Sequence, residues 1–194
     1  MKYPNKYNTK AIIICHGKSE VILCKSIKSN LRMPIEIASN NNGESSIQIT
    51  SLIKYLNNKI FKSSRSIINN YPNIEHEKNK ILNCRIFIIM DLDEKELTEE
   101  MKNNYKNGTM FKNLDYYDII VPIYNSKNLD DVCKSIGYDI DINNKTTSYK
   151  KMFPGENGNI ESFKLLKSKF KKAKGSNMYV LLDYLEECLI KFNS

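Results

Sequence analysis

Residues 85–93, Arg85-Ile-Phe-Ile-Ile-Met-Asp-Leu-Asp93, give the clearest strand pattern in this chain and indicate its fold class. Their apolar run ends abruptly in acid, which is typical of a strand buried on both faces of a sheet. Residues 11–15, 34–38 and 118–124 form three further short runs with many β-branched side chains. Pro122 cannot donate a hydrogen bond to a neighbouring strand, so we expect the last run at an edge of the sheet.

Helical periodicity fills the segments between these predicted strands. Apolar residues recur at spacings of three and four in residues 19–30, 47–60 and 128–136. Strands that alternate with helices in this way favour an α/β fold with a four-stranded, mainly parallel sheet flanked by helices.

The alternation stops near residue 139. A Lys-rich loop follows, and then two predicted helices at residues 160–172 and 177–192. We therefore expect a polar tail at residues 1–10, one α/β domain at residues 11–138, and a helical extension at residues 139–194 that packs on the same domain.

Composition excludes several classes of protein. The chain has 194 residues, 41% hydrophobic and 27% charged, which suits one globular domain and excludes collagen and a fully disordered chain. No apolar run approaches the roughly 20 residues needed to cross a bilayer, and residues 1–10 lack the apolar stretch of a signal peptide. From these two features we expect no membrane partner. The five cysteines are scattered and odd in number, so we expect reduced thiols in a cytoplasmic protein.

Two acidic residues follow the predicted strand at residues 85–90. Ligands bind at the carboxyl ends of strands in an open parallel sheet, so we expect Asp91 and Asp93 to face a crevice. Two carboxylates about 4 Å apart repel by roughly 4 kcal/mol at an effective dielectric constant of 20. Mg²⁺ or Mn²⁺ would relieve that repulsion, because Mg²⁺ binds through one or two carboxylates plus substrate phosphate. The alternative is a solvated helix start, where acids are favourable.

The turn after the first predicted strand carries a second polar cluster, His16-Gly-Lys-Ser-Glu20. Its Gly-Lys-Ser step resembles the end of a P-loop, but that motif needs a glycine where this chain has Ile12. If the first and third strands are neighbours, this turn faces the acidic pair across one crevice. His16 or Glu20 would then complete a metal site, with Lys18 placed for a phosphate. The alternatives are an exposed turn histidine and a glutamate that complements the helix dipole.

Together, the two motifs resemble the Toprim domain, with the nearest likeness to the OLD-type nucleases often linked to phage defence. The resemblance covers roughly residues 10–138. It implies that Asp91 and Asp93 bind magnesium and that the acid after the first strand acts in acid-base or metal chemistry. The family's glutamate falls on His16 in this chain. Histidine cannot supply the same anionic ligand, although it binds metals and moves protons near neutral pH.

The resemblance extends to further positions. Glu20 matches a second acid seen in OLD-like versions, and the loop at residues 43–46 is similar to a glycine-containing loop after the second strand. Related nucleases often carry another acid after the fourth strand, where we expect Asp131, ahead of Asp130; the alternative for both is helix capping. The expected catalytic residues are His16, Glu20, Asp91 and Asp93. The expected metal ligands are Asp91, Asp93, Glu20 and Asp131.

Positive charge is concentrated near the end of the chain. Residues 145–174 carry nine lysines and two glutamates, which is +7 of the formal net charge of +8. Several of these lysines recur at helical spacing, so they would form one basic face suited to a nucleic-acid backbone. The alternative is the solvated face of a lysine-rich protein. The predicted nucleic-acid-binding residues are Lys18, Lys150, Lys151, Lys164, Lys167, Lys171 and Lys174.

These patterns predict a Toprim-like nuclease that cleaves DNA or RNA with Mg²⁺ or Mn²⁺, and the resemblance implies a setting in phage defence. The alternative is a Toprim-like module in which His16 has removed the chemistry and which binds nucleic acid or a protein partner. A third interpretation is phosphoryl chemistry on a small substrate. Many Toprim relatives are attached to an ATPase, and this chain has no P-loop, so a separate ATPase or other protein is also an expected partner.

Overall fold

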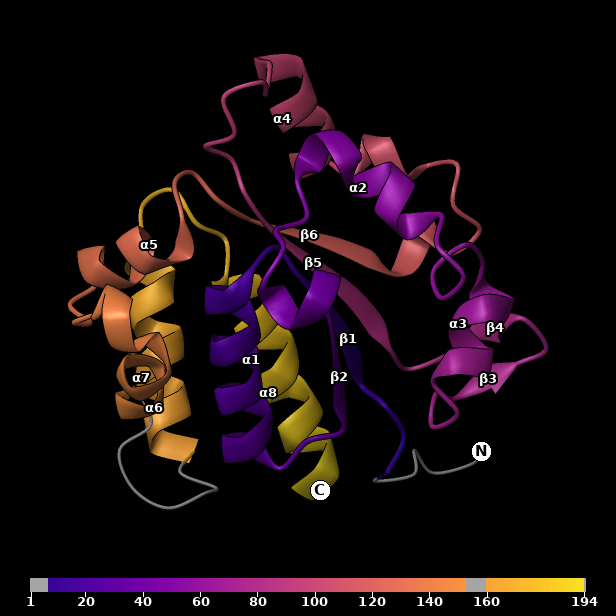
Figure 1. The fold of residues 1–194 in the computed structure, drawn as a ribbon. Coiled ribbons are helices and arrows are strands. Elements are labelled where there is room, and N and C mark those ends of the chain that lie inside the picture. Colours follow the sequence, from indigo (N-terminus) through magenta and orange to yellow (C-terminus); the bar gives the residue numbers. More distant parts are fainter. Residues whose placement is uncertain (1–6, 153–159, 194) are drawn as a thin grey trace.

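Four parallel strands form the centre of the described structure. The computed structural model describes residues 7–152 and 160–193 (Figure 1). The strands lie in the order β2-β1-β5-β6, and every neighbouring pair is parallel. Their bounds are β1 (Ala11–Cys15), β2 (Ile35–Ala38), β5 (Arg85–Asp91) and β6 (Ile120–Asn125). The predicted α/β fold with a parallel sheet and flanking helices is confirmed, and Pro122 lies in an edge strand as expected.

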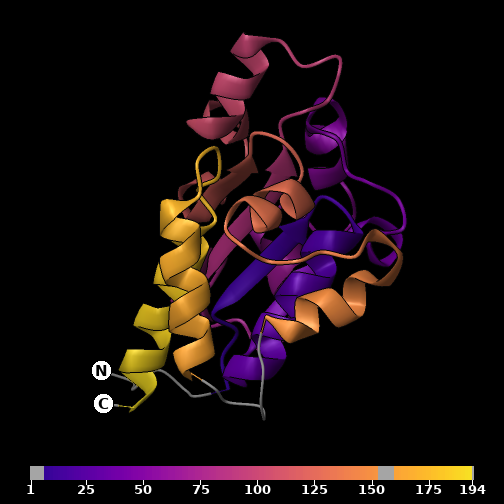
Figure 2. The same cartoon turned by 90° about the vertical axis from the view of Figure 1, so that its left-hand side faces the viewer.

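Helices from both ends of the chain cover one face of this sheet. Their apolar sides pack against Ala11, Ile13 and Cys15 of β1 and against Phe87 and Ile89 of β5. The helices on this face are α1 (Lys18–Leu31), α5 (Leu129–Ser135), α6 (Lys145–Lys151), α7 (Ile160–Lys172) and α8 (Tyr179–Asn193). Figure 2 shows α7 and α8 lying side by side.

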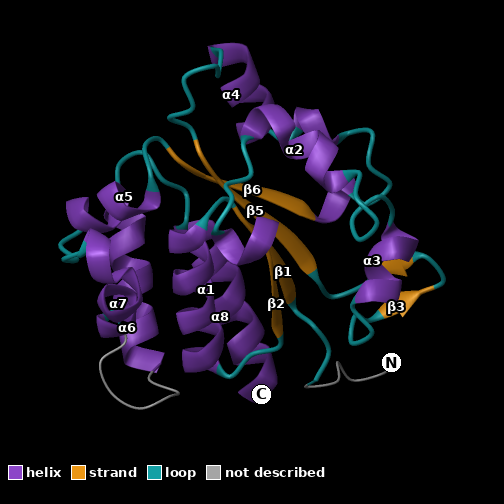
Figure 3. Ribbon diagram, in the orientation of Figure 1, coloured by secondary structure: helices purple, strands orange, loops and turns teal. Residues whose placement is uncertain are grey.

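The middle of the chain covers the other face (Figure 3). Ile12 and Ile14 of β1 and Ile86, Ile88 and Met90 of β5 point to this side. Because alternate residues of β1 and β5 are buried on opposite faces, both strands need near-continuous apolar sequence. The covering elements are α2 (Ile49–Leu56), α3 (Ser64–Asn70), α4 (Glu99–Lys106) and a small hairpin of β3 (His76–Glu77) and β4 (Lys80–Ile81). Short 3₁₀ turns complete the connections: η1 (Asn40–Gly43), η2 (Thr109–Phe111), η3 (Tyr117–Ile119) and η4 (Ile142–Asn144).

The chain leaves the two central strands in opposite directions. It passes from β1 over one face through α1 to β2, and from β5 over the other face through α4 to β6. The loops that follow β1 and β5 therefore diverge, which opens a crevice at the carboxyl ends of these two strands.

Two segments differ from the sequence-based expectation. The helix predicted at residues 47–60 stops at Leu56, because the side chain of Asn58 accepts hydrogen bonds from the N–H groups of Ile60 and Phe61 and turns the chain. The predicted Lys-rich loop contains α6, which forms where Tyr149 and Met152 bury their side chains on the α1 face of the sheet. Within the described residues, no helix is long and apolar enough to span a membrane.

Gly43 allows the loop after β2 to lie directly against the start of α1. It has a φ of +87°, and a Cβ at this position would lie 2.8 Å from the Cα and 2.9 Å from the backbone nitrogen of Lys18. The segment after Gly43 then pairs with the turn after β1, where the N–H of Ile47 donates to the carbonyl of His16 at 2.8 Å. The missing side chain at residue 43 therefore lets this loop fix the turn that carries His16.

We expect Gly43→Ala to lower the free energy of unfolding more than Gly137→Ala does. Both glycines have positive φ, +87° and +83°, so both alanines add backbone strain on the order of 1–3 kcal/mol. Only at Gly43 does the new methyl group also meet backbone atoms, because the nearest atom to a Cβ at Gly137 is the Nζ of Lys169, at 3.9 Å. Urea denaturation of both variants measures the difference, and equal losses would contradict the packing role of Gly43.

Candidate functional site

A pocket of about 410 Å³ opens at the carboxyl ends of β1 and β5. The two strands are neighbours: Cys15 pairs with Ile89, and the N–H of His16 donates to the carbonyl of Ile89 at 3.0 Å. The turn after β1 and the acidic end of β5 therefore share one crevice. The polar side chains that line it are His16, Lys18, Ser19, Glu20, Ser46, Asn128, Asp91, Asp130, Asp131, Lys134 and Lys145.

His16 is held in a fixed orientation by the loop after Gly43. Its Nδ1 lies 2.8 Å from the carbonyl oxygen of Ile47. A carbonyl only accepts, so Nδ1 carries the proton and donates it. The other ring nitrogen, Nε2, lies 3.9 Å from Oδ2 of Asp91. The ring therefore presents Nε2 to the acidic end of β5.

Glu20 lies in the first turn of α1 and is only 2% exposed. Its Oε2 accepts a hydrogen bond at 2.9 Å from the N–H of Gly17, the N-cap residue of α1, and this bond holds the carboxylate at the amino end of the helix. Burial raises the pKa of Glu20, and this effect outweighs the hydrogen bonds and the nearby His16 that act to lower it. The protein therefore holds an acid here that resists ionisation.

Asp91 is the last residue of β5 and is 4% exposed. Its Oδ1 accepts a hydrogen bond from Nδ2 of Asn125 at 3.0 Å, and Asn125 is in turn fixed by the hydroxyl of Ser176 at 2.8 Å. Burial, and then the charge of Glu20, raises the pKa of Asp91 to about 8. Glu20 and Asp91 are therefore two mutually repelling acids in one pocket.

A second cluster of polar side chains lies at the pocket around Asp130, and the sequence did not predict its contacts. Nζ of Lys145, from α6, lies 2.6 Å from Oδ2 of Asp130 and 2.9 Å from Oγ of Ser19. The hydroxyl of Tyr149 donates to Oδ1 of Asp130 at 2.7 Å. Burial acts to raise the pKa of Asp130, but the hydrogen bonds from Lys145, Tyr149 and Ser19 outweigh it and lower the pKa. Asp130 is therefore an ionised, paired carboxylate beside the Glu20–Asp91 pair.

Asp131 and Asp93, the other two acids predicted as site residues, are not buried in the pocket as Glu20 and Asp91 are. Asp131 lines the pocket and is also part of the α5 cap: its N–H donates to Oδ1 of Asn128, and its Oδ2 accepts from Nδ2 of Asn128. Asp93 is exposed and is not among the residues that line the pocket. Asp93 contributes to the site only through its charge, which adds to the raised pKa of Asp91.

The predicted basic residues are spread over several environments. Lys167 is ion-paired with Asp183, at 3.1 Å, and with Glu186, so its side chain is only 16% exposed. Lys171 shares Asp183 at 3.1 Å. These contacts join α7 to α8. The positive charges of Lys167 and Lys171 are therefore paired with acids, although their helical spacing predicts a basic face open to nucleic acid.

The remaining predicted lysines are more open. Lys18 lies at the pocket and pairs with Glu44 at 2.8 Å, with both side chains more than half exposed. Lys164 pairs with Glu161 one turn earlier, at 3.1 Å. Lys150, Lys151 and Lys174 are exposed. The exposed lysines therefore include those at the end of α6, the helix whose first residue, Lys145, lines the pocket, as well as those of α7.

The donors of the pocket suit a hard, partly hydrated cation. Within the described ranges, no three His, Cys, Asp or Glu side chains converge tightly enough to enclose a metal ion. Mg²⁺ does not require such an enclosure, because it keeps several waters and uses one or two carboxylates together with substrate phosphate. Glu20 and Asp91 fit that pattern, and their mutual repulsion favours a counter-charge between them.

Comparison with known proteins adds no assignment to these residues. No family model, no curated protein and no solved structure matches the chain. The function is therefore inferred from the chemistry of the pocket.

We expect the free energy of unfolding, measured in EDTA, to fall as the pH rises from 5 to 8. The folded protein keeps a proton on Asp91 up to about pH 8, whereas an ordinary aspartate releases it near 3.8, so the unfolded chain binds fewer protons in this window. The slope for one such carboxyl is at most about 1.4 kcal/mol per pH unit. Urea denaturation at each pH measures it.

The same experiment has two internal comparisons. Asp91→Asn should flatten the slope, whereas Glu96→Gln, at an exposed acid outside the pocket, should leave it unchanged. Millimolar Mg²⁺ should stabilise the wild type more at pH 8 than at pH 5, because the ion competes with protons for the carboxylates. A stability that is independent of both pH and Mg²⁺ would contradict the two-acid pocket.

Proposed function

We propose that this protein cleaves phosphodiester bonds in nucleic acids with a Mg²⁺ or Mn²⁺ ion held by Glu20 and Asp91. The observation that carries the proposal is the burial of these two acids in one pocket at the carboxyl ends of β1 and β5. Among the described residues, neither forms an ion pair with a lysine or arginine. A bound divalent cation would supply that counter-charge and polarise the phosphoryl group of the substrate.

Cationic groups at the pocket suit a substrate that carries phosphate. Lys18, Lys134 and Lys145 all line it, and they come from α1, α5 and α6. The ion pair of Lys18 with Glu44 is largely solvent-exposed, so its exchange for a phosphate contact costs little. Lys145 reaches the pocket from the basic segment, whose exposed Lys150 and Lys151 extend the positive surface away from it. This placement supports a polyanionic substrate over a small neutral one.

His16 is the residue that we assign to proton transfer. The hydrogen bond from Nδ1 to Ile47 leaves Nε2 of the neutral ring as the acceptor that faces the pocket. Nε2 can take a proton from an attacking water or return one to the leaving oxygen. In this proposal His16 replaces the glutamate of the Toprim pattern as the acid-base group, and the two buried carboxylates supply the negative charge that the ring lacks.

The proposal keeps some predicted residues and omits others. Asp131 is kept as a further metal ligand because it lines the pocket, whereas Asp93 is omitted because it does not. Kinship with the Toprim domain of OLD-type nucleases is part of the proposal. It is supported by the order of the elements, with the His16 turn after β1 and Asp91 at the end of β5 facing one crevice.

We expect Glu20→Gln and Asp91→Asn each to slow cleavage by on the order of 100-fold or more, because a metal ion contributes several kcal/mol to the transition state. His16→Ala should lose roughly 10²- to 10⁴-fold, the usual contribution of a positioned acid or base. Purified protein is incubated with single-stranded and duplex DNA and RNA, with Mn²⁺, Mg²⁺ or EDTA, and the products are separated on denaturing gels.

Glu96→Gln is the matched control for these variants and should cleave at the wild-type rate, because this acid is exposed and outside the pocket. Cleavage that persists in EDTA would contradict the metal-dependent proposal. Retention of nucleic acid by the wild type, without any metal-dependent cleavage, would replace it with the binding module in which His16 has removed the chemistry.

We expect nucleic-acid affinity to fall with salt, with a log-log slope of about −4 to −5 for some five phosphate contacts on duplex DNA. Lys150→Gln with Lys151→Gln should reduce the slope by roughly 2, since each phosphate contact contributes about 0.9. Fluorescence anisotropy in EDTA measures both slopes. The exposed pair Lys54→Gln with Lys59→Gln, around α2 on the opposite face, should change little. An affinity independent of salt would favour a small substrate.

A further inference from the structure

The loop after β5 is tied to the start of α2 by a side chain outside the pocket, Glu94. Its Oε1 accepts a hydrogen bond from the N–H of Ile49, the first residue of α2, and its Oε2 accepts one from the hydroxyl of Thr50 at 3.1 Å. Glu94 is partly buried and does not line the pocket. A single carboxylate therefore joins the loop that follows Asp91 to the segment that follows β2.

The start of α2 depends on this contact, because the N-cap residue of the helix supplies no side-chain acceptor. That residue is Gln48, which has an extended backbone and makes no capping hydrogen bond with its side chain. Ile49 is only 2% exposed, so water is a poor substitute as an acceptor for its N–H. A carboxylate here accepts from the first turn and complements the positive end of the helix dipole. Glu94 therefore caps a helix that begins 45 residues earlier in the chain.

Ile47, two residues before α2, holds the ring of His16. Its carbonyl oxygen lies 2.8 Å from Nδ1 of His16, and its N–H donates to the carbonyl of His16 at 2.8 Å. The direction of a carbonyl group is set by the peptide plane that it shares with the next residue, here Gln48. The N–H of Ile47 fixes the chain before this plane, and Glu94 fixes the chain after it, in the first turn of α2. The Ile47 carbonyl is therefore held from both sides.

The segment that carries Glu94 is anchored at the end of β5. The N–H of Leu92 donates to the carbonyl of Asn125 at 2.8 Å, and the side chain of Leu92 is buried in the core that α2 covers. The same segment follows directly on Asp91, whose Oδ2 lies 3.9 Å from Nε2 of His16. One short stretch of chain therefore carries both the acid that faces Nε2 and the acid that caps α2.

We propose that Glu94 is a positioning residue for His16. By capping α2 it holds the carbonyl of Ile47 in place, and so keeps the neutral imidazole in the Nδ1–H tautomer, with Nε2 free to accept a proton. The tautomer of a histidine is set by the hydrogen bond that one of its nitrogens makes. Loss of the Ile47 acceptor allows the Nε2–H form, which has no acceptor facing the pocket. The tautomer rests on these hydrogen bonds alone, whereas its effect on cleavage rests on the proposed function.

The histidine tautomers test the proposal without a cleavage assay. The chain has two histidines, so long-range ¹H–¹⁵N spectra of the full chain, in EDTA and at a pH where the rings are neutral, report both, and His76→Gln assigns the signals. The Nδ1–H form of His16 should dominate in the wild type. Glu94→Ala should lower its ratio to the Nε2–H form roughly 2- to 10-fold, the effect of one hydrogen bond. His76, in the exposed hairpin, should not change. An unchanged ratio for His16, or a wild type that is mainly Nε2–H, would overturn the proposal.

Two variants separate the contact of Glu94 from its negative charge. Glu94→Gln keeps an oxygen for the N–H of Ile49 and offers an N–H to the hydroxyl of Thr50, so it should retain the wild-type ratio. Glu96→Gln removes a charge from the same loop, at an exposed residue outside the pocket, and should also retain it. A fall in either variant as large as that in Glu94→Ala would indicate an effect of charge and contradict the positioning role.

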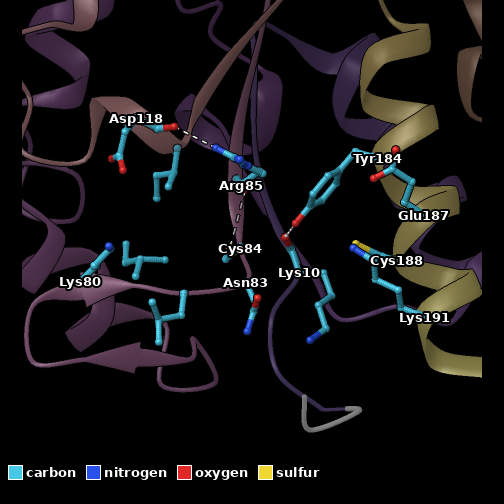
Figure 4. A pocket seen from close by; sticks show the side chains of 13 residues that line it. Lys10, Lys80, Asn83, Cys84, Arg85, Asp118, Tyr184, Glu187, Cys188 and Lys191 are labelled. Atoms are coloured by element: carbon cyan, nitrogen blue, oxygen red, sulfur yellow. Dashed lines mark hydrogen bonds between the residues drawn. The ribbon is translucent and has the colours of Figure 1, made fainter. Parts of the chain in front are cut away.

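Asp118→Asn is the control at the opposite end of the sheet. Asp118 comes just before β6 and lines a separate pocket at the amino ends of the strands (Figure 4). Its backbone carbonyl accepts the hydrogen bond from Nη1 of Arg85, at 2.9 Å, so the substitution removes one negative charge without removing this contact. The tautomer ratio of His16 should stay at the wild-type value. A fall in the ratio here would also indicate an effect of charge and contradict the positioning role.

A double-mutant cycle tests the consequence for cleavage. Glu94→Ala should slow metal-dependent cleavage by no more than about tenfold, because it changes only the fraction of molecules that hold the productive tautomer. In the His16→Ala background it should have no further effect. An equal loss in both backgrounds, or a loss of about 100-fold as expected for a metal ligand, would overturn the positioning role in the reaction. An absence of cleavage by the wild type would contradict the proposed nuclease alone, and the tautomer ratio would still decide the role of Glu94.

Discussion

The structure around the main pocket depends on one electrostatic constraint: Glu20 and Asp91 are both buried where they repel each other. The pairing of β1 with β5 brings the start of α1, which carries Glu20, close to Asp91 at the end of β5. The packing of α1 on the sheet removes water from Glu20. A carboxylate in such a place is stable only with hydrogen bonds, a proton or a cation. The N–H of Gly17 and the amide of Asn125 supply the first of these, and the raised pKa values show that they are not sufficient.

Distant parts of the chain hold this pair in place. Asn125, which binds Asp91, is fixed by Ser176 from the segment between α7 and α8. Lys145 reaches Ser19 across 126 positions of sequence and neutralises Asp130 beside the pair. The helices after residue 139 are therefore structural supports of the pocket as well as a cover for the sheet. A cation that enters the pocket would meet side chains already fixed by contacts from both ends of the chain.

The sequence was sufficient for features that depend on local pattern. A strand buried on both faces must be continuously apolar, so β1 and β5 could be read directly, and the turn after each strand could be placed at the same edge of the sheet. The sequence was insufficient where the environment of a side chain depends on residues far away along the chain. Lys167 fits a basic helical stripe, yet Asp183 and Glu186 of α8 take its charge. Asp93 follows the strand as closely as a ligand should, but only Asp91 remains inside the ladder and turns into the crevice. Nothing in the spacing of Lys145 signals its contact with Asp130.

The lysines on the surface and the two buried acids of the pocket act on a polyanion in different ways, and this difference bears on the proposed mechanism. A net +8 with exposed lysines on α6 would attract a polyanionic substrate over distances of about a Debye length, roughly 8–10 Å at physiological salt. At Glu20 and Asp91 themselves the same polyanion would be repelled whenever these acids lose the protons that burial favours. In the proposed function a divalent cation would remove that conflict, because its charge would offset the two carboxylates and favour a phosphate at the same place. In the proposed function, attraction at long range and placement in the pocket would therefore be separate electrostatic steps, and only the second would depend on the metal.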